Sequence, residues 1–197
     1  MRNHTCKLIL KPASTAMLGI RLCILVIALS FSIGGNGFSQ PQKGLEYKFK
    51  AVYVFNFLQF TEWPDSAFQN ERSPVILGVF GDDPFGSVLD ETIQSEKVGD
   101  HPIIIKRFQA TDDLAQCHAL FISPSEKEIV PAVLKRVGET STLTISDIDG
   151  FGDLGGCIGF YMEKNKLRFV INMKALKQSD LHVSSKLLRL AKIINPL

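Results

Sequence analysis

The sequence predicts an α/β domain with a mainly parallel sheet flanked by helices, a C-terminal β-hairpin and closing helices. Two observations predict this fold. Short apolar runs of strand length alternate with helical patterns between residues 45 and 148, and two β-rich runs joined by a tight link follow at 157–172. Strands that alternate with helices form parallel sheets, whereas a tight link joins antiparallel strands.

The first 39 residues have the pattern of a cleaved signal peptide. An apolar run of 12 residues at 22–33 is too short to span a bilayer comfortably and long enough for a signal-peptide core. The small residues Gly37 and Ser39 precede the expected cleavage after Ser39. An uncleaved N-terminal anchor is the alternative. The leader has no acidic residue and four basic ones, Arg2, Lys7, Lys11 and Arg21.

Removal of the leader changes the charge of the chain. Of 22 basic residues, 18 remain against 20 acidic ones, which gives the mature protein a net charge of −2. A nearly neutral chain without a basic run has no electrostatic footprint for nucleic acid. No later stretch reaches 18 apolar residues, so we expect residues 40–197 to form one domain that is soluble after signal cleavage.

The first expected helix covers residues 45–63. Apolar residues recur there at steps of three and four, and Pro64 ends the helix because the residue before a proline avoids helical geometry. This segment has more aromatic side chains than one buried face usually needs. Some of them are therefore candidates for a partner-binding surface, and Tyr53 and Phe57 are the test positions that helical phase suggests.

The middle of the chain alternates regularly between strand and helix patterns. Pro84 suits the first turn of a helix with Asp83 as its cap, and Gly138 follows the end of another. The expected elements are a strand at 75–80, a helix from 84 to about 95, strands at 102–108 and 119–122, a helix opened by residues 123–126 and running to about 137, and a strand at 142–148.

The C-terminal part begins with a predicted hairpin of strands at 157–163 and 167–172. Its link contains no glycine, so Asn165 is the expected left-handed residue. Two helices at 173–178 and 181–194 then close the domain. The hairpin is expected to supply antiparallel edge strands.

A loop with three aspartates follows the strand that ends near residue 148. Asp147, Asp149 and Asp153 offer carboxylate oxygens, but the segment lacks the further donor and the distant glutamate of a helix-loop-helix calcium site. A glycine-rich turn is therefore the favoured interpretation, and no metal site is predicted. The loop still lies where open α/β sheets bind ligands, which makes these three residues a candidate small-molecule site.

The chain carries no catalytic signature. It has no GxSxG elbow and no pair of histidines at metal-ligand spacing, and the loop at 81–86 lacks the lysine and spacing of a phosphate-binding loop. Cys117 and His118 are adjacent, but neighbouring residues on a strand point to opposite faces. We therefore predict no catalytic residue, no cofactor and no enzyme activity.

Six segments together carry a resemblance to a known family. They are residues 46–64, 78–86, 117–126, 143–160, 167–172 and 184–194. These segments resemble the YfiR-like periplasmic proteins. The resemblance implies a periplasmic regulator, self-associating as a homodimer, that controls an inner-membrane diguanylate cyclase or the periplasmic domain of a sensor kinase. A periplasmic small-molecule binding protein without a signalling partner is the alternative, and an undetected hydrolase is a third.

Two cysteines, Cys117 and Cys157, remain after signal cleavage. In the family, the cysteine that matches Cys117 often has a partner in the strand before the turn at 81–86, and Gly78 occupies that place here. Cys117 and Cys157 therefore either pair with each other, which would permit redox sensing, or remain as two buried thiols, which we favour.

Overall fold

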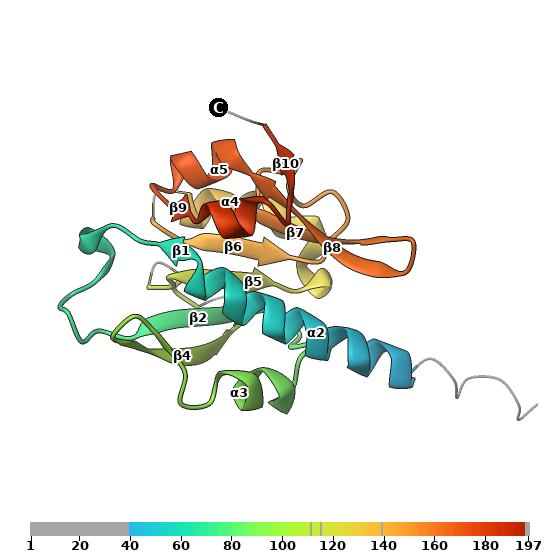
Figure 1. Cartoon of the computed structure of the whole chain (residues 1–197), viewed down its shortest axis with the longest axis horizontal. Coiled ribbons are helices and arrows are strands. Elements are labelled where there is room, and N and C mark those ends of the chain that lie inside the picture. The colour runs from blue at the N-terminus through green and yellow to red at the C-terminus, as the bar shows by residue number, and fades with distance from the viewer. Residues whose placement is uncertain (1–39, 111, 115, 139, 196–197) are drawn as a thin grey trace, which may run out of the picture. The chain divides into compact units, whose positions relative to one another are not determined.

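The computed structural model describes residues 40–195 apart from 111, 115 and 139, and the predicted signal peptide lies outside these residues. Its compact unit 42–197 is built on an eight-stranded sheet (Figure 1). The strands, in spatial order, are β10 (Lys192–Ile194), β8 (Lys166–Asn172), β7 (Ile158–Glu163), β6 (Leu143–Ser146), β5 (Ala119–Ile122), β2 (Val75–Phe80), β4 (His101–Phe108) and β3 (Lys97–Val98).

The sheet is mainly parallel, as the sequence predicts. Within the described part of this eight-stranded sheet, only the β7–β8 hairpin and the short β3–β4 pair are antiparallel. The expectation that the hairpin forms the edge of the sheet is wrong, because β10 pairs in parallel with β8 and takes that edge. At the hairpin tip, both Lys164 and Asn165 have positive φ, which makes a two-residue turn that suits the twist of the strands.

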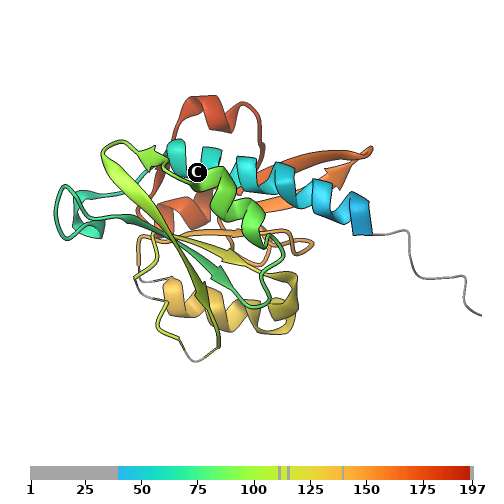
Figure 2. The same cartoon turned by 90° about the horizontal axis from the view of Figure 1, so that it is seen from below.

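Helices cover both faces of this sheet. α2 (Gln40–Gln59), α3 (Ser87–Ile93), α5 (Met173–Gln178) and α6 (Ser185–Leu188) contribute to one hydrophobic cluster. The 3-10 segment η3 (Pro124–Ile129) leads into α4 (Val130–Val137), which packs in a second cluster. Figure 2 shows the sheet between α4 on one side and α2 with α3 on the other.

The two clusters exist because side chains alternate across each strand. In β5, Ala119 and Phe121 pack in the cluster beneath α2, whereas Leu120 and Ile122 pack in the cluster beneath α4. Since the strand is buried on both faces, it reads in the sequence as a continuous apolar run. The predicted strands at 75–80 and 119–122 and the predicted helix at 173–178 are confirmed residue for residue.

The first helix ends earlier than predicted. α2 stops at Gln59, and β1 (Thr61–Glu62) then pairs with β9 (His182–Val183) in a separate two-stranded sheet. The Thr61 hydroxyl donates to the Phe57 carbonyl at 2.7 Å and satisfies one of the last carbonyls of the helix. The prediction of a helix to residue 63 is therefore wrong.

The predicted helix at 181–194 is also wrong. This stretch forms β9, the single turn of α6 and β10. The Ser184 side chain accepts a hydrogen bond from the Leu187 N–H and caps that turn. The flanking residues are strands because they pair with β1 and β8, which are distant in sequence.

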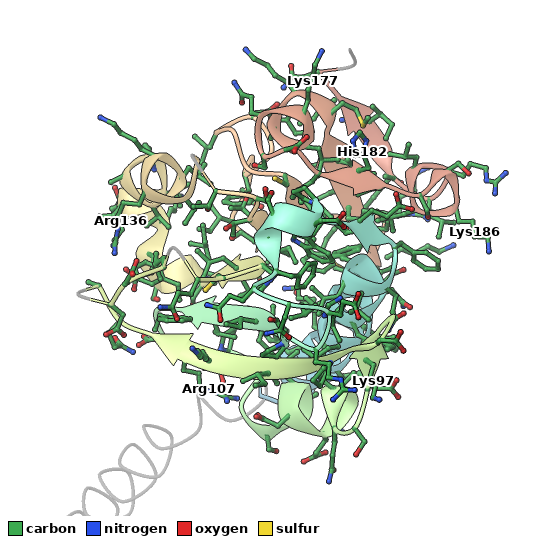
Figure 3. All side chains as sticks on the ribbon, turned by 90° about the vertical axis from the view of Figure 1, so that its left-hand side faces the viewer. Lys97, Arg107, Arg136, Lys177, His182 and Lys186 are labelled. Carbon is green, nitrogen blue, oxygen red and sulfur yellow. The ribbon has the colours of Figure 1, made fainter. Side chains whose placement is uncertain are left out.

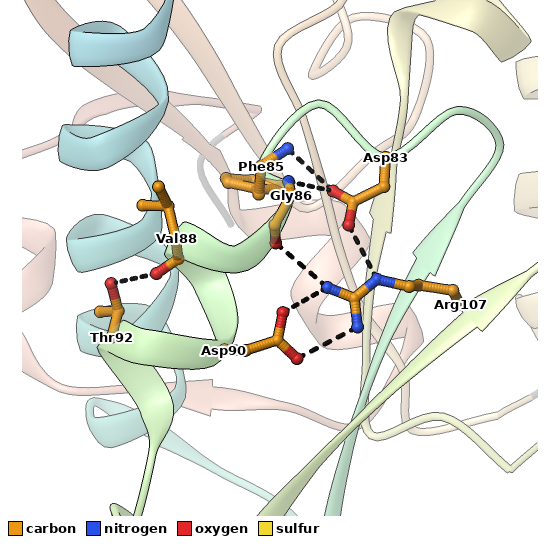
Figure 4. Close-up of polar contacts among 7 residues, drawn as sticks. All are labelled: Asp83, Phe85, Gly86, Val88, Asp90, Thr92 and Arg107. Atoms are coloured by element: carbon orange, nitrogen blue, oxygen red, sulfur yellow. Dashed lines mark hydrogen bonds and ion pairs between the residues drawn. The ribbon is translucent and has the colours of Figure 1, made fainter.

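The turn between β2 and α3 is held by Arg107 of β4 (Figure 4). Asp83 accepts the N–H groups of Phe85 and Gly86 at 2.8 and 3.3 Å and so closes the turn. The prediction that it caps the helix is wrong, because α3 begins only at Ser87 and Gly86 is its N-cap. The Arg107 guanidinium binds Asp83 at 2.8 Å and Asp90 at 2.5 Å, and it lowers the pKa of Asp90. This loop is a structural turn in which Asp83 is paired with Arg107.

Candidate partner-binding surface

The outward face of α2 carries three large apolar side chains in a row. Leu45, Phe49 and Val52 are 54%, 56% and 49% exposed, and their spacing of four and three residues places them on one side of the helix. We call these three residues the outer stripe. Scattered apolar residues are ordinary on a protein surface, but a contiguous apolar stripe is typical of an interaction site.

The inward face of α2 holds the helix to the sheet through aromatic packing. Phe57 is 0% exposed, and its ring centroid lies 4.9 Å from that of Phe169 and 5.4 Å from that of Phe160. Tyr53 is half-buried and packs against the same two rings at 5.6 and 6.1 Å. These aromatic pairs join α2 to the β7–β8 hairpin.

The choice of Tyr53 and Phe57 as exposed test positions is thus wrong for Phe57, which is fully buried, and Tyr53 is only partly accessible. Helical phase alone could not distinguish the two sides of α2, because aromatic residues occur nearly all around it. The β7–β8 hairpin determines which side of α2 is buried, since it extends the sheet beneath Tyr53 and Phe57.

A buried ionic cluster provides a second anchor between α2 and the sheet. The Lys50 ammonium lies 2.5 Å from Asp147 Oδ2 and 2.5 Å from Glu46 Oε1, and the Tyr47 hydroxyl donates to Asp147 Oδ2 at 2.7 Å. The side chains of Lys50 and Asp147 are 4% and 7% exposed. Burial, and then the hydrogen bond to Asp147, raises the pKa of Tyr47.

This cluster gives Asp147 a role that differs from the ligand-binding one considered from the sequence. Its Oδ2 is bound to α2, while its Oδ1 is buried without a hydrogen-bond partner among the described residues. The sequence contained a signal for this contact: Lys50 lies between Tyr47, Ala51 and Val54 in the buried phase of the helix. A lysine at such a position needs an anionic partner.

The structure does not bring the three aspartates of the loop together. Asp147 faces α2, whereas Asp149 and Asp153 are exposed. Within the described part of the chain, no group of three or more histidine, cysteine or acidic residues could hold a metal ion. The geometry gives these aspartates no common ligand, and a small-molecule role for the loop stays a prediction.

Cys117 and Cys157 are free thiols, both buried and in different hydrophobic clusters. The redox bridge considered from the sequence is therefore not formed. Burial raises the pKa of Cys117 to about 12 and also raises the pKa of Cys157, so neither thiol forms the reactive thiolate readily. A Cβ atom built at Gly78 would lie 2.9 Å from the Cys117 sulfur, so residue 78 does face this cysteine.

Although Cys117 and His118 precede β5 rather than lie in it, His118 packs apart from Cys117. It lies among aromatic side chains that include Trp63 and Phe68, whereas Cys117 packs in the cluster beneath α4. The six basic side chains that Figure 3 labels come from six different elements and are spread over this side of the molecule.

Comparisons with known proteins agree with the fold. A family model described as YfiR/HmsC-like matches residues 47–192. The solved structures that resemble the chain include one titled as a conserved domain protein from Vibrio cholerae O1 biovar El Tor strain N16961, with 9% identity and a TM-score of 0.52. The similarity covers 75% of this chain and 59% of that one, so the chain spans less than two thirds of that protein. No curated protein matches the sequence.

Proposed function

The chain belongs to the YfiR/HmsC-like family, a family of periplasmic regulatory proteins, and we propose that it binds and controls an inner-membrane signalling protein. The proposed partner is a diguanylate cyclase or the periplasmic domain of a sensor kinase. In this proposal the N-terminal 39 residues direct export and are then removed. The protein acts by binding and not by catalysis.

The single observation that carries this proposal is the outer stripe of α2. Leu45, Phe49 and Val52 project from a helix whose opposite face is fixed by the Lys50–Asp147 cluster and by aromatic packing. A rigid support matters because a partner then binds the stripe without an entropic cost for ordering the helix. Among the described residues, no helix is long and apolar enough to cross a membrane.

The nearly neutral charge of the mature chain favours an apolar contact over an electrostatic one. Lys48 is exposed beside the stripe. The basic side chains that Figure 3 labels come from six different elements and form no single patch. Apolar anchors at the centre of an interface usually carry most of the binding energy. We therefore assign the partner contact to the outer stripe rather than to a charged patch.

A regulatory assay tests this function. In a strain that lacks the gene, wild-type protein is expected to restore the cellular level of cyclic di-GMP, and the double variant Phe49→Gln/Val52→Gln is expected to fail. Met162→Gln is the matched control, because Met162 of β7 is 54% exposed and lies on a different element. Equal periplasmic amounts of the three proteins exclude a folding defect.

If loss of the gene changes neither cyclic di-GMP nor the activity of any sensor kinase, the proposed function is wrong. If the double variant restores regulation as well as Met162→Gln does, the function survives and the assignment of the surface is wrong. Self-association through the same stripe is distinguished by sedimentation, because it predicts a dimer of the purified wild-type protein that the double variant converts to a monomer.

One observation favours the alternative of a small-ligand binder. A cavity of about 590 Å³ lies between the segment after α2 and the amino ends of the strands, and this volume is within the usual range of ligand sites. Uncharged polar side chains dominate its lining, among them Ser66, Gln69, Ser73, Gln116 and Ser141. The outer stripe remains the stronger signal, because the buried polar side chain of the cavity lining, His118, already bonds backbone groups with both ring nitrogens.

A further inference from the structure

The segment 63–74, which connects β1 to β2, is fastened to the sheet at two histidines, His118 and His101. Trp63 donates from Nε1 to the His118 carbonyl at 2.9 Å, and the Phe68 ring stacks on the His118 ring with centroids 4.7 Å apart. Phe68 also stacks on His101 of β4 at 4.1 Å. The segment lies at the left of Figure 1, where β5 and β6 begin.

Both ring nitrogens of His118 are bonded to backbone groups that fix its protonation. Nδ1 accepts the N–H of Ile76 at 3.1 Å, and Nε2 lies 3.0 Å from the Ala67 carbonyl. Since a carbonyl only accepts, Nε2 must carry the proton and Nδ1 must be bare. The ring is therefore neutral. Its Nδ1 is bonded to β2 and its Nε2 to the segment 63–74, so the ring links the two.

The surroundings of this ring do not accommodate a second proton. It would go to Nδ1, where its N–H would face the Ile76 N–H, so one bond would be replaced by two opposed donors. The positive ring would also be enclosed, because His118 is only 8% exposed. We propose that His118 is a proton-sensitive clamp: protonation breaks the bond of its ring to Ile76 of β2, and the ring then moves away from β2 together with the segment 63–74 that Ala67 ties to it.

The groups around His118 set the direction of this switch. Burial lowers the pKa of His118, and repulsion from His101, on the far side of Phe68, lowers it further. The Ala67 bond opposes this shift. The segment itself faces the ring with Trp63, Ala67 and Phe68, which do not titrate, and the preceding residue Cys117 remains a neutral thiol because its pKa is raised.

His101 is a natural control within the same stack. Its Nδ1 lies 2.6 Å from the Ser73 carbonyl and so carries a proton already. A second proton would go to its Nε2, and this leaves the bond to Ser73 intact. Protonation of His101 therefore breaks no bond, whereas protonation of His118 breaks the bond between its ring and β2 and leaves the bond to Ala67 in place.

Release of the segment would open the cavity of about 590 Å³ and uncover Cys117. Ser66, Ala67, Gln69, Ser73 and Pro74 of the segment form one wall of this cavity, and Cys117 and His118 form part of the other. The clamp is distinct from the outer stripe of α2. Its opening and the proposed binding of a signalling partner can therefore be tested separately.

The chain has one tryptophan, and it lies in the clamp. Trp63 emission of the full-length protein should change in one step as the pH falls from about 7.5 to about 5, with a midpoint below 6.5, while far-UV circular dichroism stays constant. His118→Gln should abolish the step. His101→Gln should keep it and move its midpoint to higher pH, because a repelling charge is removed.

Three results would overturn the clamp. They are a step that persists in His118→Gln, wild-type emission that stays flat over this range, and loss of circular dichroism together with emission. If His118→Gln does not fold, ring ¹⁵N shifts of the wild-type protein decide the question. They should show the Nε2–H tautomer at neutral pH and a His118 titration that coincides with the emission step, and a His118 that stays neutral through the step contradicts the proposal.

Discussion

The two faces of α2 differ in almost every property, although they belong to the same 20 residues. The inner face is buried and makes specific contacts: Lys50 with Asp147, and Phe57 with Phe160 and Phe169. The outer face exposes Phe49 and its neighbours, and among the described residues Leu45, Phe49 and Val52 make no ring contact that anchors this face. Side chains of the same aromatic type thus serve stability on one face and are free for binding on the other.

This difference separates two kinds of mutational effect. Substitutions on the inner face should lower the free energy of unfolding, since they leave a cavity or an unpaired charge. Substitutions on the outer face should leave that free energy nearly unchanged and alter only binding. A substitution in α2 that strongly changed both the free energy of unfolding and partner binding would contradict this distinction between the two faces.

The largest effect is expected for Phe57→Ala. Because Phe57 is fully buried among aromatic rings, its truncation should lower the free energy of unfolding by about 4 kcal/mol. Phe49→Ala on the outer face is the matched control and should change it by less than about 0.5 kcal/mol. Urea unfolding followed by circular dichroism measures both, and equal losses would mean that the two faces are not distinct.

Lys50→Met should come next, with a loss of about 3 kcal/mol, because it leaves Asp147 buried without its cation. Lys48→Met removes an exposed lysine two residues earlier and should be nearly neutral. The double variant Lys50→Met/Asp147→Leu should recover part of the loss in urea unfolding, since a buried pair can be replaced by apolar groups. A double variant less stable than Lys50→Met contradicts this account.

The sequence predicts the local features of this molecule well and the non-local ones poorly. Residues 75–80 and 119–122 read as buried strands because their apolar runs reflect burial on both faces. Residues 182–183 and 192–194 carry no comparable signal, because they become strands only by pairing with β1 and β8. The sequence likewise located the aromatic helix but not its exposed side, which depends on where the β7–β8 hairpin packs.

A disulfide on the far face of the sheet would sharpen the comparison. Gly78→Cys places a Cβ atom 2.9 Å from the Cys117 sulfur, close to the ~3 Å separation that a disulfide of about 2.05 Å bond length requires. Leu120 and Phe108 must shift to admit it. Oxidation should therefore stabilise by about 2 kcal/mol, below the roughly 4 kcal/mol of the chain-entropy model.

Thermal unfolding with and without reductant measures this effect, and thiol labelling should show Cys117 blocked and Cys157 free. Regulation by the oxidised variant should match that of the wild type, because the bridge lies beneath α4 and away from α2. Loss of regulation on oxidation would indicate that signalling uses movement between β2 and β5.

A smaller effect on the free energy of unfolding is expected as the pH is lowered. His118 is buried and neutral, so its folded pKa lies below the unfolded value of 6.5. The stability it contributes is present above pH 6.5 and is lost as the pH falls from there through the folded pKa, where the unfolded state binds more protons. Urea unfolding at several pH values should show this loss in the wild type and a weaker dependence in His118→Gln. Equal slopes for the two proteins would show that His118 is not the titrating group.

Site-specific crosslinking in cells tests the central claim most directly. A photoreactive amino acid at position 49, on the outer stripe, should give an adduct that mass spectrometry identifies as an inner-membrane diguanylate cyclase or sensor kinase. The same group at position 162, which is equally exposed, should give none. An adduct from position 162 alone, or one from position 49 that contains only a second copy of this chain, would contradict the assignment of the outer stripe to a signalling partner.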